Sequence, residues 1–206
     1  MRKSLAKQIP GRAGGFTLLE LLVVIAIIGI LAGLMFPAAS GALRRAEKTN
    51  AQNTAYNLKN AISAYFTEYR KYPVESGMTN ETDELRSDRK LMDPLMGSDS
   101  EDGLKLNPRK IAFYTGKQAK RKGPGVYIKG VTLETDGGGE LWDPFGNEPP
   151  EGGYYFVRLD LDYNNRVEKP LWDTSSESEV LPESILVWSS GKDGSEQDDA
   201  DNIKTW

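Results

Sequence analysis

An apolar run of 21 residues, Phe16 to Phe36, lies near the amino terminus and contains one charged side chain, Glu20. As a helix rising about 1.5 Å per residue, the run would extend roughly 30 Å, about the thickness of the hydrocarbon core of a bilayer. A lone carboxylate is poorly tolerated in hydrocarbon, so Glu20 needs a partner or a function there. The run therefore predicts a membrane helix whose one acid has a specific purpose.

The fifteen residues before this run carry no acid and four cations, Arg2, Lys3, Lys7 and Arg12. A basic flank favours a cytoplasmic amino terminus, although three cations also follow the far end of the run. The alternative is an ordinary secretory signal peptide or signal anchor. A cleaved signal peptide fits poorly, because the apolar run is longer than usual and the small residues, Gly14 and Gly15, precede it.

Composition excludes several kinds of site. The chain of 206 residues has no Cys and no His, so it cannot form a disulfide, a Ser-His-Asp triad, a Cys nucleophile or a zinc site of Cys and His. A metal site would be built from oxygen atoms, which favours calcium or magnesium. The net charge of -4 gives no broad basic footprint, so we expect no nucleic-acid partner.

The residues from Gly15 to Val23, Gly-Phe-Thr-Leu-Leu-Glu-Leu-Leu-Val, closely resemble the class III signal of type IV pilins and type II secretion pseudopilins. The resemblance implies that a prepilin peptidase cuts after Gly15 and that the new terminal residue, Phe16, is N-methylated. It also implies that Glu20 pairs with the Phe16 amine of a neighbouring subunit during assembly, which would lower the cost of burying both ions. The alternative is a glutamate that extends toward the lipid headgroups.

The next part of the chain predicts a continuing helix. Pro37 removes one helical hydrogen bond and predicts a kink. An apolar stripe at helical spacing follows, made of Ala51, Ala55, Leu58, Ile62, Phe66 and Tyr69. Tyr72-Pro73 then ends the helix. The predicted organisation is a leader at 1–15, an assembly helix at 16–36, an amphipathic continuation at 37–72 and a globular domain at 73–206.

The globular domain is expected to contain several short strands. The segments with strand patterns are 111–114, 126–133, 154–161 and 185–188, with turns at 136–139 and 142–149 and a hairpin turn at Asn164-Asn165 before Val167. Residues 74–125 are expected to form short helical turns and loops, with a solvated basic run at 117–122. Strands after one long helix predict an α+β fold with an antiparallel sheet packed on that helix, as in pilins.

Two acidic segments could bind a cation. Asp160-x-Asp162-x-Asn164 has the first ligand spacings of a calcium loop, but the later positions do not match, so a polar turn is the expected structure. The carboxy-terminal segment places five acids within nine residues, 193–201. Crowded carboxylates repel one another unless they stay solvated or bind a cation.

This carboxy-terminal segment resembles the calcium-binding end of the major type II secretion pseudopilin. The resemblance implies ligands from the side chains of Asp193, Asp199 and Asp201 and from the carbonyl of Ser190, with the choice between Asp198 and Asp199 open. The alternative is a flexible acidic tail. Docking of the apolar Ile203 and Trp206 would favour the calcium reading.

Together these features predict a structural subunit of a type II secretion pseudopilus, not an enzyme. The expected protein is anchored in the bacterial inner membrane with its carboxy-terminal domain in the periplasm. Its expected partners are other copies of itself, prepilin peptidase, an assembly platform and other pseudopilins. A major type IV pilin or minor pseudopilin is the nearest alternative. A membrane-anchored binding domain or hydrolase is another, drawing its carboxylates from Asp143, Asp160, Asp162 and Asp173.

Overall fold

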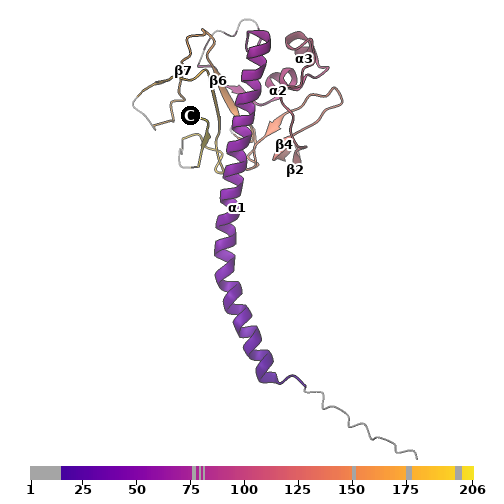
Figure 1. Ribbon diagram of the computed structural model, residues 1–206, viewed down its shortest axis with the longest axis vertical. Helices are drawn as coiled ribbons and strands as arrows, with labels where there is room; N and C mark the ends of the chain where they lie inside the picture. Colours follow the sequence, from indigo (N-terminus) through magenta and orange to yellow (C-terminus); the bar gives the residue numbers. More distant parts are fainter. Residues whose placement is uncertain are drawn as a thin grey trace, which may run out of the picture. The chain divides into compact units, whose positions relative to one another are not determined.

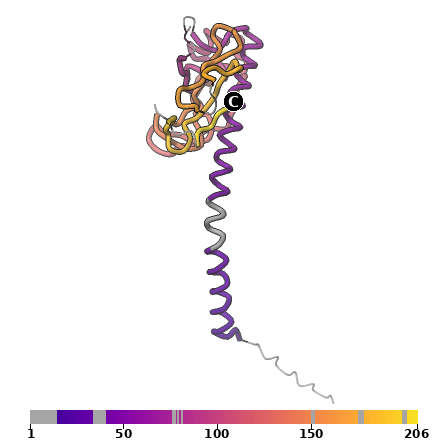
Figure 2. The backbone as a smooth tube through the Cα atoms, turned by 90° about the vertical axis from the view of Figure 1, so that its left-hand side faces the viewer, coloured from indigo at the N-terminus to yellow at the C-terminus, as the bar shows by residue number. Residues whose placement is uncertain are grey.

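The computed structural model describes residues 15–75, 78, 80, 82–149, 152–174, 178–197 and 201–206, and of residues 34–40 it describes only the backbone. The chain divides into two compact units, Met1–Arg44 and Arg45–Trp206. The long helix α1 (Leu18–Tyr69) contributes residues to both units (Figure 1; Figure 2). The second unit combines this helix with small antiparallel sheets, so the predicted α+β class is confirmed.

The amino-terminal unit consists, in its described part, of the first half of α1. Its large apolar side chains from Phe16 to Leu31 are exposed, with Leu18 at 87% and Ile30 at 66% of their full accessible area. A search of the described residues for an apolar helix long enough to cross a membrane finds none. The helix predicted for this segment is present, and its apolar surface has no partner among the described residues of the chain.

The second half of α1 forms the centre of the other unit. Ala51, Ala55, Leu58 and Ile62 are fully buried, as the periodic stripe predicts, whereas Phe66 and Tyr69 are partly buried. Tyr65 is also fully buried and was not part of the predicted stripe. The helix ends at Tyr69 because Arg70 adopts a left-handed conformation (φ 56°), three residues before the proline expected to end it.

The main sheet has four antiparallel strands in the order β1-β6-β9-β10. These strands are β1 (Leu85–Arg86), β6 (Phe156–Leu159), β9 (Ile185–Ser189) and β10 (Ile203–Lys204). One face, with Val157, Val187 and Ile203, belongs to the same buried cluster as α1. The other face, with Phe156 and Trp188, is covered by a second apolar cluster. Both sides of the sheet are therefore buried.

The remaining elements are short. Two helices, α2 (Arg89–Met96) and α3 (Glu101–Leu106), are capped by the side chains of Asp88 and Ser100. Three two-stranded sheets pair β2 (Lys120–Gly123) with β3 (Val126–Ile128), β4 (Gly130–Val131) with β5 (Leu141–Trp142), and β7 (Val167–Glu168) with β8 (Val180–Leu181). The expected helical turns within 74–125 are therefore present.

Several predicted strands need correction. Residues 111–114 form no strand; the backbone N–H groups of Phe113 and Tyr114 instead both donate to the carbonyl of Leu95, at 2.8 and 2.9 Å. The strand predicted at 126–133 is broken in two where Lys129 (φ 60°) and Gly130 (φ 152°) leave the extended region.

Two further corrections concern pairing. Asn164-Asn165 does form a turn, but it does not join a hairpin, because β6 pairs with β1 and β9 whereas β7 pairs with β8. The strand expected to be the last, β9, is followed by β10 at the end of the chain. Strand order depends on contacts between distant segments, which local patterns do not specify.

Candidate functional site

The start of α1 forms a reciprocal cap around Glu20. The Thr17 backbone N–H and hydroxyl both donate to Glu20 Oε2, at 2.9 and 2.8 Å, and the Glu20 N–H donates to Thr17 Oγ1 at 3.2 Å. This is a capping box, which satisfies backbone donors that a helix leaves unpaired at its first turn. Gly15 and Phe16 lie just before the cap and are exposed, with Phe16 at 79%.

Glu20 thus caps the helix, a structural role that is separate from its predicted role in assembly. The signal was readable, because Thr17-x-x-Glu20 before an apolar run is the sequence pattern of a capping box. The capping glutamate holds the Thr17 N–H, one residue beyond Phe16. The carboxylate is therefore bound one residue beyond Phe16, close in sequence to the predicted cleavage position after Gly15.

Pro37 lies within the bounds of α1. Its side chain belongs to the stretch that is not described, so the kink at this residue stays a prediction.

The carboxy-terminal segment starts from a buried polar contact at the end of β9. The Ser189 hydroxyl donates to Asp143 Oδ2 at 2.8 Å, while Asp143 Oδ1 accepts the N–H groups of Phe145 and Gly146, at 2.9 and 3.3 Å. Asp143 is fully buried, and burial raises the pKa of its carboxyl. The predicted turn at 142–149 is thus tied to the strand that leads into the acidic segment.

After this strand, the predicted ligand Asp201 binds the backbone at another predicted ligand, Asp193. Asp201 Oδ2 accepts the N–H groups of Lys192 and Asp193, at 2.7 and 3.3 Å. These bonds join the end of the loop to its first residues. Gly191 has φ of 69°, and a side chain there would meet the Asp201 backbone at 2.7 Å. A glycine is required at this position for the loop to close.

Of the other predicted ligands, Ser190 is described and Asp199 is not. Ser190 is buried beside Gly191, at the same end of the loop. Asp199 and its alternative, Asp198, lie outside the described residues. Within the described ranges, no three acidic side chains gather closely enough to bind a metal ion.

The loop nevertheless contains an atom that suits a cation. Asp201 Oδ1 is buried and has no hydrogen-bond partner among the described residues, although its sister oxygen accepts two bonds. A buried carboxylate oxygen without a partner is costly, and calcium binds carboxylate and carbonyl oxygens. Asp201 Oδ1 is therefore an oxygen of the kind that calcium binds, whereas Asp193 Oδ1 accepts the Ser195 N–H at 2.8 Å.

The end of the chain is docked on the sheet, as expected from its apolar residues. Ile203 is fully buried in β10, and the indole N–H of Trp206 donates to Asp173 Oδ2 at 2.6 Å. Lys204 Nζ lies 3.0 Å from Asp173 Oδ1, and its carbonyl accepts Gln52 Nε2 of α1 at 2.6 Å. A flexible tail is therefore wrong for residues 201–206.

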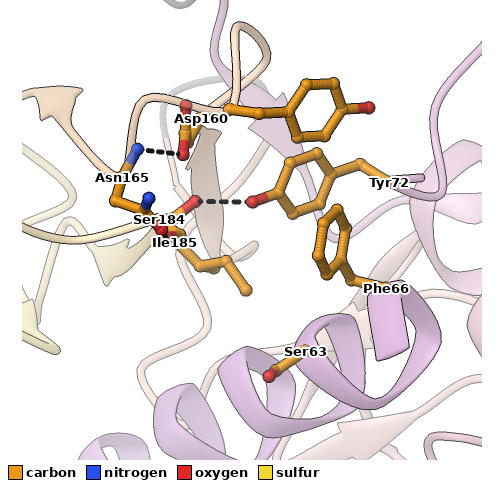
Figure 3. Close-up of a pocket in the computed structure, with 8 residues that line it drawn as sticks. Ser63, Phe66, Tyr72, Asp160, Asn165, Ser184 and Ile185 are labelled. Atoms are coloured by element: carbon orange, nitrogen blue, oxygen red, sulfur yellow. Dashed lines mark hydrogen bonds between the residues drawn. The ribbon is translucent and has the colours of Figure 1, made fainter. Parts of the chain in front are cut away.

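The Asp160 segment forms the expected polar turn. Asp160 Oδ1 and Oδ2 accept the N–H groups of Asn164 and Asn165, at 2.9 and 2.7 Å. The turn borders a pocket of about 220 Å³, also lined by Phe66, Tyr72 and Tyr163 (Figure 3). Burial, and then the neighbouring Asp162, raise the pKa of Asp160.

The residues that line the pocket pack two segments of the chain together. The Tyr72 and Tyr163 rings are parallel with centroids 5.9 Å apart, and Phe66 packs against both. The Tyr72 hydroxyl donates to the Ser184 carbonyl at 3.3 Å (Figure 3). These contacts attach the turn after β6 to the end of α1.

The four acids considered for a hydrolase do not meet in one cleft. Asp160 and Asp162 are neighbours, but Asp143 binds Ser189 and backbone N–H groups, and Asp173 binds Lys204 and Trp206. Asp143 and Asp173 therefore act as structural acceptors, in two separate places.

Comparison with known proteins finds a family match in the amino-terminal segment. Residues 11–36 match the family described as the prokaryotic N-terminal methylation motif. Among curated relatives, the chain is 36% identical over 89 residues to the type II secretion system core protein G of Escherichia coli K12, and 41% identical over 68 residues to that of Aeromonas hydrophila. It is also 42% identical over 62 residues to the fimbrial protein EcpC of Eikenella corrodens.

These matches cover part of each protein. They include 43%, 32% and 30% of this chain and 59%, 48% and 40% of the respective relatives. The chain thus spans about half the length of the curated relatives it matches. No solved structure matches the chain. The predicted resemblance to type IV pilins and pseudopilins is confirmed.

Proposed function

We propose that this chain is the precursor of a structural pseudopilin, which assembles into a helical filament of the type II secretion class. The observation that carries the proposal is the exposed apolar first half of α1, which matches the methylation motif and starts with a capped Glu20. An apolar surface of this extent needs a lipid or protein environment. The match to core protein G of Escherichia coli extends over 89 residues, against 62 for the fimbrial protein EcpC, which supports the pseudopilin reading over the pilin alternative.

In this proposal the precursor is anchored in the inner membrane by residues 16–36, with its amino terminus in the cytoplasm and residues 45–206 in the periplasm. Prepilin peptidase cuts after Gly15, and Phe16 becomes the methylated terminus. The partners are further copies of the chain, other pseudopilins and an assembly platform. The function is structural, and the filament supports protein export.

Glu20 then acts in two states. In the precursor its carboxylate accepts the Thr17 N–H and hydroxyl, which fixes the start of the helix. After cleavage the Phe16 ammonium of a neighbouring subunit supplies an opposite charge within an apolar bundle. Removing one member of a buried ion pair is strongly unfavourable, so an entering subunit is held at the register that pairs the two ions.

Calcium in the carboxy-terminal loop belongs to the same proposal. Asp201 would supply its free Oδ1, with further oxygens from Asp193 and from the Ser190 carbonyl, and with Asp198 or Asp199 completing the set. The ion would fasten the loop that leads to β10. Since the chain has no Cys, it would take the place of a stapling disulfide.

Mass spectrometry of the protein purified from its own cells tests the central proposal. We expect a mature chain that begins at N-methylated Phe16, together with filaments that contain it in electron micrographs. Retention of all fifteen leading residues, with no filaments, would contradict the proposal and favour a plain membrane anchor.

A further inference from the structure

Positive charge is concentrated in one stretch of this acidic chain. From Gly103 to Leu133 there is no Asp or Glu, although the protein as a whole carries four more acids than bases. The eight cations of this stretch are Lys105, Arg109, Lys110, Lys117, Lys120, Arg121, Lys122 and Lys129. The stretch includes β2 and β3 and the loop before them.

The cations divide into two groups by their partners. Lys105, Arg109, Lys110 and Lys129 form ion pairs with Glu75, Glu68, Asp99 and Glu47, in that order. Lys117, Lys120, Arg121 and Lys122 are exposed, and among the described residues none of them lies in a salt bridge. Positive charge is therefore neutralised elsewhere in the stretch and left open on this segment, which we call the basic hairpin (117–125).

The contacts of the basic hairpin do not use up its charge. Lys122 Nζ donates to the carbonyls of Phe145 and Gly146, at 3.4 and 2.9 Å, and Arg121 Nε donates to the Gly123 carbonyl at 3.2 Å. Carbonyl groups accept hydrogen bonds without cancelling a unit charge. Lys117 and Lys120 extend into solvent. Lys122 is also attracted to the buried carboxylate of Asp143, so Lys117, Lys120 and Arg121 are the charges that the hairpin leaves open.

The hairpin lies at the end of its unit where α1 enters. In Figure 1, β2 lies at the end of the unit at which α1 enters. Lys129, the residue after β3, is 3.0 Å from Glu47, the third residue of the unit that begins at Arg45. Glu47 follows Phe36 by eleven residue steps, which in a helix span at most about 17 Å. In the proposed anchored state, the residue that binds Lys129 is therefore at most about 17 Å along the chain from the end of the anchor.

We infer that the basic hairpin binds anionic phospholipid headgroups of the membrane in which the unassembled subunit is anchored. This inference rests on the proposed anchor at residues 16–36. Cations close to an anionic surface are attracted to it over a Debye length, about 8 Å at physiological salt. Contact with lipid would hold the globular unit at the surface before the subunit enters a filament.

The residue types favour lipid over a protein partner. Two of the three open charges are lysines, which are depleted at protein interfaces, whereas arginine and aromatic residues are enriched there. The tip of the hairpin, Gly123-Pro124-Gly125, offers no large apolar side chain that could insert into a partner's pocket. A mobile, strongly hydrated ammonium suits a diffuse layer of phosphates.

The test uses the full chain reconstituted in vesicles. Because the chain has no Cys, Gln118→Cys in the hairpin gives a unique position for a fluorescent label, and Leu171→Cys, which is 99% exposed on the β7–β8 connection, gives a reference position. Quenching by headgroup-labelled lipid reports how close each label lies to the bilayer. The vesicles contain phosphatidylcholine alone or phosphatidylcholine mixed with phosphatidylglycerol.

The charge variant is Lys117→Gln, Lys120→Gln, Arg121→Gln, which spares Lys122 because its ammonium holds two backbone carbonyls. The matched control is Lys71→Gln, Lys90→Gln, Arg166→Gln. It removes the same charge from exposed residues outside the hairpin that form no salt bridge among the described residues.

We expect anionic lipid to bring the hairpin label to the surface in the wild type and in the control, and high salt to release it. Each cation near the surface changes the equilibrium constant for surface binding about fivefold, so the charge variant should lower that constant about 100-fold. Equal quenching of the hairpin label in both lipid mixtures would overturn the inference. So would a signal that depends on protein density, because it would indicate a second copy as the partner.

Flotation with vesicles of phosphatidylcholine alone separates this inference from the proposed function. If the wild type fails to float with these vesicles, the anchor itself is wrong and the inference falls with it. If the wild type and both variants float equally and the hairpin label ignores anionic lipid, only the inference fails.

Discussion

The two halves of α1 differ in what their apolar side chains contact. In the first half, Leu18, Ile30 and their apolar neighbours are exposed, whereas in the second half Ala55, Leu58 and Ile62 are completely buried against the sheet. The family match falls on the first half, at residues 11–36. The pattern of the first half therefore suits partners outside the chain, and that of the second half suits the chain's own fold.

Glu20, in the first half of α1, combines a contact within the chain with a proposed contact between chains. Glu20 is bound within its own helix in the single chain, yet in the proposed filament it faces another subunit. Substitutions at Thr17 and Glu20 can separate these two purposes, because the cap needs a hydrogen-bond acceptor whereas the ion pair needs a charge.

The largest effect is expected at Glu20. We predict that Glu20→Leu and Glu20→Gln both abolish incorporation into filaments, because an unpaired Phe16 ammonium in an apolar bundle costs about 3 to 5 kcal/mol for each subunit. Immunoblots of sheared filaments measure incorporation, and cleavage at Gly15 is checked in the same cells.

Two comparisons sharpen this result. Glu20→Gln keeps an acceptor at the third helical position, so it should retain the capping box that Glu20→Leu loses. Thr17→Ala loses the Thr17 hydroxyl from the cap at a cost of about 1 kcal/mol but keeps the charge, and filaments should still form. Normal assembly of Glu20→Gln would show that charge is not required.

A cavity in the carboxy-terminal unit tests the second region, in the apolar cluster on the face of the sheet away from α1. Trp188 is fully buried between Phe156, Trp172 and Trp206. Trp188→Ala should lower the free energy of unfolding of the carboxy-terminal unit by about 3 to 5 kcal/mol. Urea denaturation of the full chain in detergent, followed by circular dichroism, measures the change.

Leu171→Ala is the matched control, because Leu171 is 99% exposed and should change stability by less than about 0.5 kcal/mol. Vesicle flotation of Trp188→Ala should stay normal, since the first half of α1 does not depend on this core. Loss of flotation would mean that the two regions are not independent.

A smaller effect is expected from calcium. At a hundredfold excess over its dissociation constant, a bound ion adds about 2.7 kcal/mol to the free energy of unfolding. Thermal unfolding of the wild type should therefore shift to lower temperature on addition of EDTA. Asp201→Asn removes the unpartnered anionic oxygen and should unfold at the same temperature with and without EDTA. Identical wild-type curves in calcium and in EDTA would remove the calcium proposal.

The smallest effect concerns pH and Asp143. Burial raises the pKa of this carboxyl in the folded protein, so the folded state holds the proton more tightly than the unfolded state does. The resulting stability is fully present below the unfolded pKa, near 3.9, and is lost as the pH rises through the raised folded pKa. Asp143→Asn can still accept two backbone N–H groups and bond to Ser189, but it does not titrate.

We therefore expect the unfolding free energy of Asp143→Asn, relative to the wild type, to increase between acidic and neutral pH. Urea titrations at several pH values measure this difference. A constant difference across the range would mean that burial does not perturb Asp143.

Local sequence patterns determined a good part of this protein. The apolar run with Glu20, the stripe from Ala51 to Ile62 and the docking of Ile203 could all be read from the chain, because each depends on spacing along one element or on apolar residues next to polar ones. The capping box at Thr17 was equally readable and was missed.

Tertiary structure alone decided the rest. Local patterns do not predict that β6 pairs with β1 and β9, or that β10 forms the last strand of the sheet. They also do not predict that the N–H groups of Phe113 and Tyr114 donate to the Leu95 carbonyl instead of to a strand. Nor do they reveal that Asp201 closes on Lys192 and Asp193, or that four cations of an acid-free stretch are neutralised by acids outside it. These features join residues far apart in sequence, and their energies depend on which distant backbone groups and charges the fold brings within bonding distance.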